Sequence, residues 1–164
     1  MTNNIIADIG GTNVRFAQVS ATGISHIQKY LVADYPTIQD AIEYYMSQYS
    51  DTVFTAVCLA IAAPANNDWV DFANSHWSFS QSDLQSALNL PHLYVINDFT
   101  AVAHSLPMLT DEQLVQIGTG VQHQHGNIAV FGPGTGLGVE HLAYTADAWH
   151  TLDGEGGHVD FAPV

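Results

Sequence analysis

The sequence predicts a mixed α/β fold, with helices on the faces of one β-sheet. Three segments rich in strand-forming residues open the chain, separated by turns that contain glycine, and they predict an antiparallel meander. Helical and strand-like segments then alternate, which extends the meander into a mixed sheet. No segment repeats with a period of about 20–50 residues, so a solenoid or a propeller is not expected.

Alternation of apolar and polar residues, or a continuous apolar run, marks the strands of the first part of the chain. The run at 53–63 is apolar almost throughout, so we expect that strand to be buried on both faces. The predicted strands are residues 4–9, 13–20, 24–33, 53–63, 69–72 and 93–97.

Capping patterns mark the predicted helices. Thr37 and Asp40 resemble a capping box ahead of apolar residues at helical spacing. Ser80 or Ser82 is expected to cap a second, short helix. A third helix is expected over 98–106.

A break is expected around residues 107–112. It divides the chain into a first domain, 1–108, and a second, 109–164. Strands are predicted near 113–117 and over 128–132 and 137–145, but no clear helix covers them. The second part therefore resembles the beginning of a truncated α/β domain.

The charge balance excludes several kinds of partner. Asp and Glu number 16 while Lys and Arg number 2, so the net charge of −14 reflects missing cations. Nucleic acid and anionic lipid are not expected partners, because both need clustered Lys and Arg. Any phosphate group must instead be held by backbone N–H groups and a metal ion.

The sequence contains neither a recognisable targeting signal nor a pair of cysteines. The N-terminal sequence lacks a basic region followed by a long apolar stretch, so a secretory signal is not expected. No apolar run approaches the roughly 20 residues of a membrane span. Cys58 is the only cysteine, so a disulfide within the chain is impossible, which agrees with a cytoplasmic protein. A membrane partner is not expected.

The first motif, "DIGGTN", lies where two predicted strands meet. Gly10 and Gly11 allow close approach of a ligand to the backbone, and consecutive N–H groups there can bind an anion. Thr12 adds a hydroxyl donor beside Asn13, and Asp8 could hold Mg²⁺ directly or through water. The alternative is an ordinary hairpin turn.

The second motif, "GPGTGLG", spans residues 132–138. Its glycine spacing differs from the dinucleotide-binding fingerprint, and strand follows it rather than helix. Gly134, Thr135 and Gly136 are therefore candidates to wrap phosphate oxygens with N–H groups. The alternative is a glycine-rich linker.

Asn97 and Asp98 stand where a predicted strand ends and a helix begins. Asp is a favoured helix cap, which is the structural explanation. The catalytic explanation is that ligands of open α/β sheets bind at the carboxyl ends of the strands. A carboxylate at a helix N-terminus stays ionised and can accept a hydroxyl proton.

Glu155 and His158 flank two glycines in "GEGGHVDF". The spacing is that of a metal-binding motif of helical bundles, but the glycines disfavour a helix and no partner motif exists. A polar pair that recognises hydroxyl groups is the preferred interpretation.

Six segments occur in the order "ADIGGTNVRFA", "CLAIAAP", "NSHWSFS", "VINDFTAVAHSLPML", "GPGTGLGV" and "GEGGHVDFAP". Together they resemble the amino-terminal half of bacterial-type glucokinases, which belong to the sugar-kinase, Hsp70 and actin ATPase superfamily with an RNase H-like core.

The resemblance implies a role for each motif. Gly10, Gly11 and Thr12 would form the first phosphate loop, and Gly134, Thr135 and Gly136 would belong to the second. Asp98 would be the catalytic base, and Asn97, Asp98, Glu155 and His158 would bind glucose hydroxyls.

The reaction implied is phosphorylation of D-glucose by ATP with Mg²⁺. Family members extend well past Val164, so an isolated non-catalytic sugar-binding half remains an alternative. A sugar-binding regulator on the same fold is another, and the sequence leaves a homodimer open.

Overall fold

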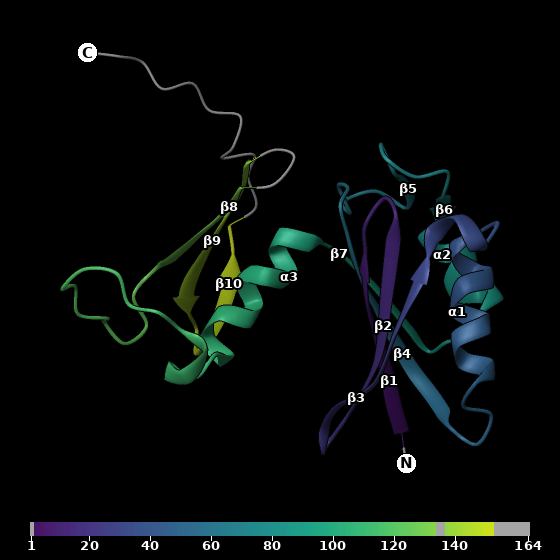
Figure 1. Cartoon of the computed structure of the whole chain (residues 1–164), viewed down its shortest axis with the longest axis horizontal. Helices are drawn as coiled ribbons and strands as arrows, with labels where there is room; N and C mark the ends of the chain where they lie inside the picture. The colour runs from purple at the N-terminus through teal and green to yellow at the C-terminus, as the bar shows by residue number, and fades with distance from the viewer. Residues whose placement is uncertain (1, 134–136, 153–164) are drawn as a thin grey trace. The chain divides into compact units, whose positions relative to one another are not determined.

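The computed structural model describes residues 2–133 and 137–152 of the chain (Figure 1). Its contacts divide the chain into two compact units, the first ending at Asp98 and the second beginning at Phe99. The domain boundary expected after residue 108 stays a prediction.

A five-stranded sheet forms the first unit, in the order β3-β2-β1-β4-β7 (Figure 1). The first three strands pair antiparallel, whereas β4 pairs parallel with both β1 and β7. The predicted meander and the predicted mixed sheet are therefore confirmed. The strands are β1 (Thr2–Ile9), β2 (Asn13–Ser20), β3 (Gly23–Leu31), β4 (Val53–Ile61) and β7 (His92–Asn97).

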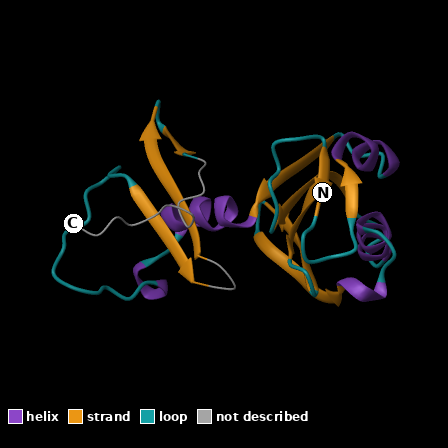
Figure 2. Cartoon of the chain, turned by 90° about the horizontal axis from the view of Figure 1, so that it is seen from above, coloured by secondary structure: helices purple, strands orange, loops and turns teal. Residues whose placement is uncertain are grey.

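Two helices, α1 (Ile38–Ser47) and α2 (Gln81–Ala87), lie on one face of this sheet (Figures 1 and 2). Thr37 caps α1 through the expected capping box: its hydroxyl accepts from the N–H of Asp40 at 3.2 Å, and its own N–H donates to that carboxylate at 2.9 Å. Ser80, rather than Ser82, caps α2. A membrane-spanning helix is absent from residues 2–133 and 137–152.

The core of the first unit lies between the sheet and these helices. The residues of β4 that face the helices, such as Leu59, are fully buried. Cys58 and Ala60 on the opposite face of the strand are only half-buried. The prediction of burial on both faces is therefore wrong for that side of β4. The largest fully buried side chains of the core are Ile5, Ile9, Phe16, Ile38, Ile42, Tyr45, Leu59, Ile61 and Trp77. A small ladder of β5 (Trp69–Asp71) and β6 (Ser78–Ser80) completes this unit.

The second unit contains an antiparallel sheet in the order β10-β9-β8, together with most of helix α3 (Asp98–Ser105). The strands are β8 (Ile128–Pro133), β9 (Leu137–Thr145) and β10 (Ala148–Thr151).

The strand predicted near 113–117 does not form. A short 3₁₀ turn, Asp111–Gln113, occupies its start, and the residues after it have no regular secondary structure. Val115 and Ile117 are almost fully exposed, so this apolar pattern lacks a neighbouring strand on which to pack.

Candidate functional site

The carboxyl ends of β1, β4 and β7 align at one edge of the five-stranded sheet. Ile9 pairs with Ile61, and Ile61 pairs with Asn97. Because these strands are parallel, the glycine turn after Ile9 and the Asn97-Asp98 pair leave the sheet at the same edge. Two strand spacings separate β1 from β7, which corresponds to about 10 Å. The first unit therefore brings the first glycine motif near the predicted base.

The turn between β1 and β2 is fixed by backbone hydrogen bonds. The N–H of Gly10 donates to the carbonyl of Asn13 at 2.9 Å, and the carbonyl of Thr12 accepts from Val32 at 3.0 Å. Gly11 and Thr12 are exposed at the tip of the turn. The arrangement matches the hairpin expected from the sequence and leaves the tip accessible to a ligand.

Gly11 also has a packing role that the sequence did not reveal. A Cβ atom on Gly11 would lie 2.5 Å from the carbonyl oxygen of Asn74 and 3.0 Å from its Cβ. At Gly10, the nearest atom to an added Cβ would be the carbonyl oxygen of Asn13, at 3.6 Å, an ordinary contact. The two glycines therefore meet different steric demands.

The segment that carries Asn74 is anchored to the chain before α1. The indole N–H of Trp77 donates to the carbonyl of Tyr35 at 3.0 Å, and Nε2 of His76 lies 3.0 Å from the same oxygen. Trp77 is buried in the core. The "NSHW" segment, Asn74 to Trp77, thus has a structural role that the sequence alone did not suggest. It places the backbone of Asn74 directly against the first glycine turn.

Asp8 lies in β1 opposite Arg15 of β2. An Nη1 atom of Arg15 lies 2.7 Å from the Asp8 carboxylate, and both side chains are more than half exposed. Arg15 also pairs with Lys29 of β3. The sequence contains one arginine and one lysine, and these two residues therefore occupy facing positions on neighbouring strands. Within the described ranges, no cluster of three or more His, Cys, Asp or Glu side chains could hold a metal ion.

Asn97 ends β7, and Asp98 is the first residue of α3. The side-chain amide of Asn97 lies 3.5 Å from the carbonyl oxygens of both Ile61 and Ala63, which are long, weak hydrogen bonds. The Asp98 carboxylate is thus carried by the first turn of α3.

The remaining predicted site residues, Gly134, Thr135, Gly136, Glu155 and His158, lie outside the described residues. Their roles stay predictions. The structure does describe β8 and β9, which flank the second glycine motif and pair at Gly132 and Gly138.

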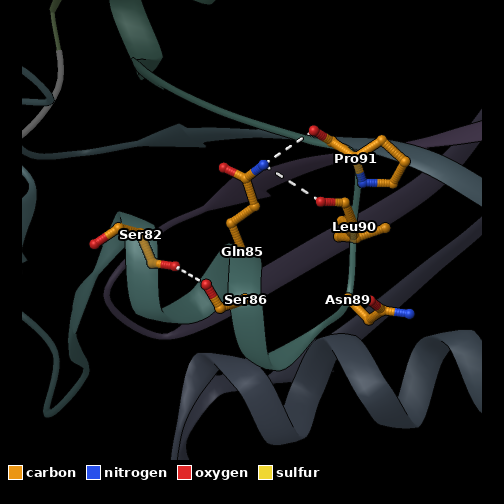
Figure 3. Close-up of a pocket in the computed structure, with 6 residues that line it drawn as sticks. All are labelled: Ser82, Gln85, Ser86, Asn89, Leu90 and Pro91. Carbon is orange, nitrogen blue, oxygen red and sulfur yellow. Dashed lines mark hydrogen bonds between the residues drawn. The ribbon is translucent and has the colours of Figure 1, made fainter.

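The first unit also has a surface depression (Figure 3). It is lined by residues of α2 and of the segment that leads into β7, where Gln85 donates to the carbonyls of Leu90 and Pro91 at 3.3 and 3.0 Å. This is the amino end of β7, whereas Asn97 and Asp98 follow from its carboxyl end. The depression is therefore separate from the predicted site.

Comparison with known proteins identifies the family. The glucokinase family profile matches residues 5–164. The chain belongs to the glucokinase family. Glucokinases of Tolumonas auensis and Cronobacter sakazakii are 47% and 44% identical to it over 161 residues, which are 97% of this chain and 50% of each relative. The chain thus spans about half the length of these glucokinases.

Solved structures agree with this assignment. A glucokinase from an Antarctic psychrotroph superposes with a TM-score of 0.89 at 38% identity, covering 99% of this chain and 52% of that one. A glucokinase of Balamuthia mandrillaris, solved with glucose, gives a TM-score of 0.68 at 22% identity over 99% and 50% of the two chains, and supports the fold alone. The expected mixed α/β fold of the actin-like ATPase superfamily is confirmed.

Proposed function

We propose that the chain contributes phosphate- and sugar-binding residues to an ATP-dependent glucokinase, which converts D-glucose and ATP into glucose 6-phosphate and ADP. The observation that carries the proposal is the pairing of Ile9 with Ile61 and of Ile61 with Asn97, because it brings a glycine turn and a carboxylate to one sheet edge. Membership of the glucokinase family adds to this support.

In the proposed reaction, the 6-hydroxyl oxygen of glucose attacks the γ-phosphorus of ATP. The bond from that phosphorus to the oxygen bridging to ADP breaks, and the hydroxyl proton passes to the carboxylate of Asp98. Asn97, Glu155 and His158 orient the sugar through hydrogen bonds. Such bonds select a hydroxyl pattern, because a sugar lacking one would leave a buried polar group without its partner.

Phosphate binding is assigned to backbone N–H groups of the two glycine motifs, Gly10 to Asn13 and Gly134 to Gly136. Asp8 would hold Mg²⁺, which neutralises phosphate charge when bound. One accessible carboxylate fits this ion, since Mg²⁺ commonly takes one or two carboxylates and completes its shell with phosphates and water. Arg15 would then share the Asp8 carboxylate with the ion. The proposed enzyme is cytoplasmic, as the sequence predicts, and a homodimer stays a prediction.

The proposal is tested with Asp98→Asn, which keeps the size of the side chain and one acceptor oxygen but removes the base. Glucose-dependent ADP formation is expected to fall by about 10²–10⁴-fold while glucose still binds, as measured by calorimetry. The assays use this chain and the complete natural reading frame, with the exposed Asp51→Asn as the matched control.

Two results would overturn the assignment. Full turnover in Asp98→Asn would exclude Asp98 as the base. Glucose binding without ADP formation by the wild-type complete protein would instead identify a sugar-binding protein or regulator.

A further inference from the structure

The outer glycines of "GPGTGLG" form a notch for an aromatic ring. Gly132 and Gly138 pair across β8 and β9. A Cβ atom added to either glycine would overlap the ring of Phe99, the second residue of α3. Only glycine at these two positions allows the ring to lie directly against the two strands.

A partly buried hydrogen bond holds the next residue of the helix to the same hairpin. The hydroxyl of Thr100 donates to Oε2 of Glu140 in β9 at 3.1 Å. The other carboxylate oxygen, Oε1, accepts from the backbone N–H of His141 at 2.8 Å. Glu140 is only 4% exposed, and a buried carboxylate is costly unless it is hydrogen-bonded in this way. These two bonds therefore favour one position of α3 against β9.

We propose that Phe99 and Glu140 are positioning residues, which anchor the first turn of α3 to the β8–β9 hairpin and thereby hold the helix that begins at Asp98. This inference rests on the proposed role of Asp98 as the base. A close-packed ring has few alternative positions, and Asp98 directly precedes it in the same helix. The outer glycines, Gly132 and Gly138, would thus hold the helix that carries the proposed base.

The aromatic contact is tested from both partners, with Phe99→Leu and Gly138→Ala. Each is expected to lower kcat for ADP formation by about 10- to 100-fold with little change in the KM for glucose, because a small misplacement of a catalytic group slows the chemical step. In the double variant the smaller side chain makes room for the added methyl group, so the two effects are expected to be less than additive.

Two substitutions serve as matched controls. Gly120→Ala adds a methyl group where no atom lies within 4 Å, and Phe131→Leu alters an exposed ring on the opposite face of β8. Both are expected to retain wild-type kcat.

The polar contact is tested with Glu140→Gln and Glu140→Leu. The glutamine retains a carbonyl oxygen that can accept from Thr100, so most of the turnover is expected to remain. The leucine removes both acceptors, and kcat is expected to fall as in Phe99→Leu. Equal turnover in the two variants would refute the role of Glu140.

Amide hydrogen exchange of residues 101–105, whose N–H groups can bond within the helix, provides a readout that is independent of turnover. Faster exchange in Phe99→Leu and Gly138→Ala than in the controls is expected. Unchanged exchange and unchanged kcat in both variants would overturn the inference. If the wild-type complete protein forms no ADP, the proposed function fails, and faster exchange would then support the anchoring of α3 while its catalytic purpose is refuted.

Discussion

Gly10 and Gly11 are adjacent, yet the structure separates a steric role from a ligand-binding role. Gly11→Ala would place a methyl group against the backbone of Asn74, so we expect the free energy of unfolding to fall by about 1–3 kcal/mol. Gly10→Ala meets only an ordinary contact, so its stability is expected to stay within about 0.5 kcal/mol of wild type.

If the turn holds phosphate through close backbone approach, Gly10→Ala is nonetheless expected to weaken nucleotide binding. Urea denaturation measures the stability of each variant, and calorimetry with a non-hydrolysable ATP analogue measures binding. Wild-type affinity in a stably folded Gly10→Ala would show that this glycine does not contact the nucleotide.

At the residue scale, the sequence predicts positions better than contacts. Asn97 and Asp98 could be placed at a sheet edge because a strand pattern ends there and a helical pattern begins. The contact of Phe99 with Gly132 could not be predicted, because it joins segments more than thirty residues apart in the sequence and depends on shape alone. Asn74 beside Gly11 was missed for the same reason.

At the scale of elements, α2 depends on a carboxylate outside the helix. Asp68 accepts from the hydroxyl of Ser80 at 2.6 Å and from the N–H of Ser82 at 2.9 Å. The hydrogen bond from Ser80, followed by that from Ser82, lowers the pKa of Asp68 below its ordinary value of 3.8. A lowered pKa in the folded state contributes stability above pH 3.8, and that contribution is lost as the pH falls through the lowered value.

We therefore expect Asp68→Asn to destabilise the protein at neutral pH and to reduce the loss of stability on acidification. The measurement is urea denaturation between pH 7 and pH 3, with Asp71→Asn in the adjacent strand β5 as the control. Identical pH profiles for Asp68→Asn and wild type would contradict this role of Asp68.

Capping chemistry predicted the helices well, because Thr37 and Ser80 act on backbone groups within a few residues. Strands proved less predictable, since each needs a partner elsewhere in the chain. Residues 113–117 have strand-forming residues but no ladder, whereas β10 forms by pairing with β9, although its sequence attracted no prediction.

At the scale of the whole molecule, the net charge of −14 opposes the approach of an anionic nucleotide. Long-range attraction cannot compensate, because only Arg15 and Lys29 provide fixed positive charge. The proposed binding of ATP must therefore depend on short-range contacts with backbone N–H groups and on the bound Mg²⁺. The chain also spans about half of its relatives, so activity is a property to measure in the complete protein.

The facing positions of Arg15 and Lys29 in β2 and β3 have a practical consequence. Trypsin cleaves only after these two residue types, so both of its sites in this chain lie inside one hydrogen-bonded ladder. We expect the native protein to resist trypsin until the meander opens, and cleavage at both sites should then begin together. The rate of digestion, followed by mass spectrometry, would thus report the opening of one sheet edge without any engineered label. Rapid cutting under native conditions would show that this edge opens far more readily than its pairing implies.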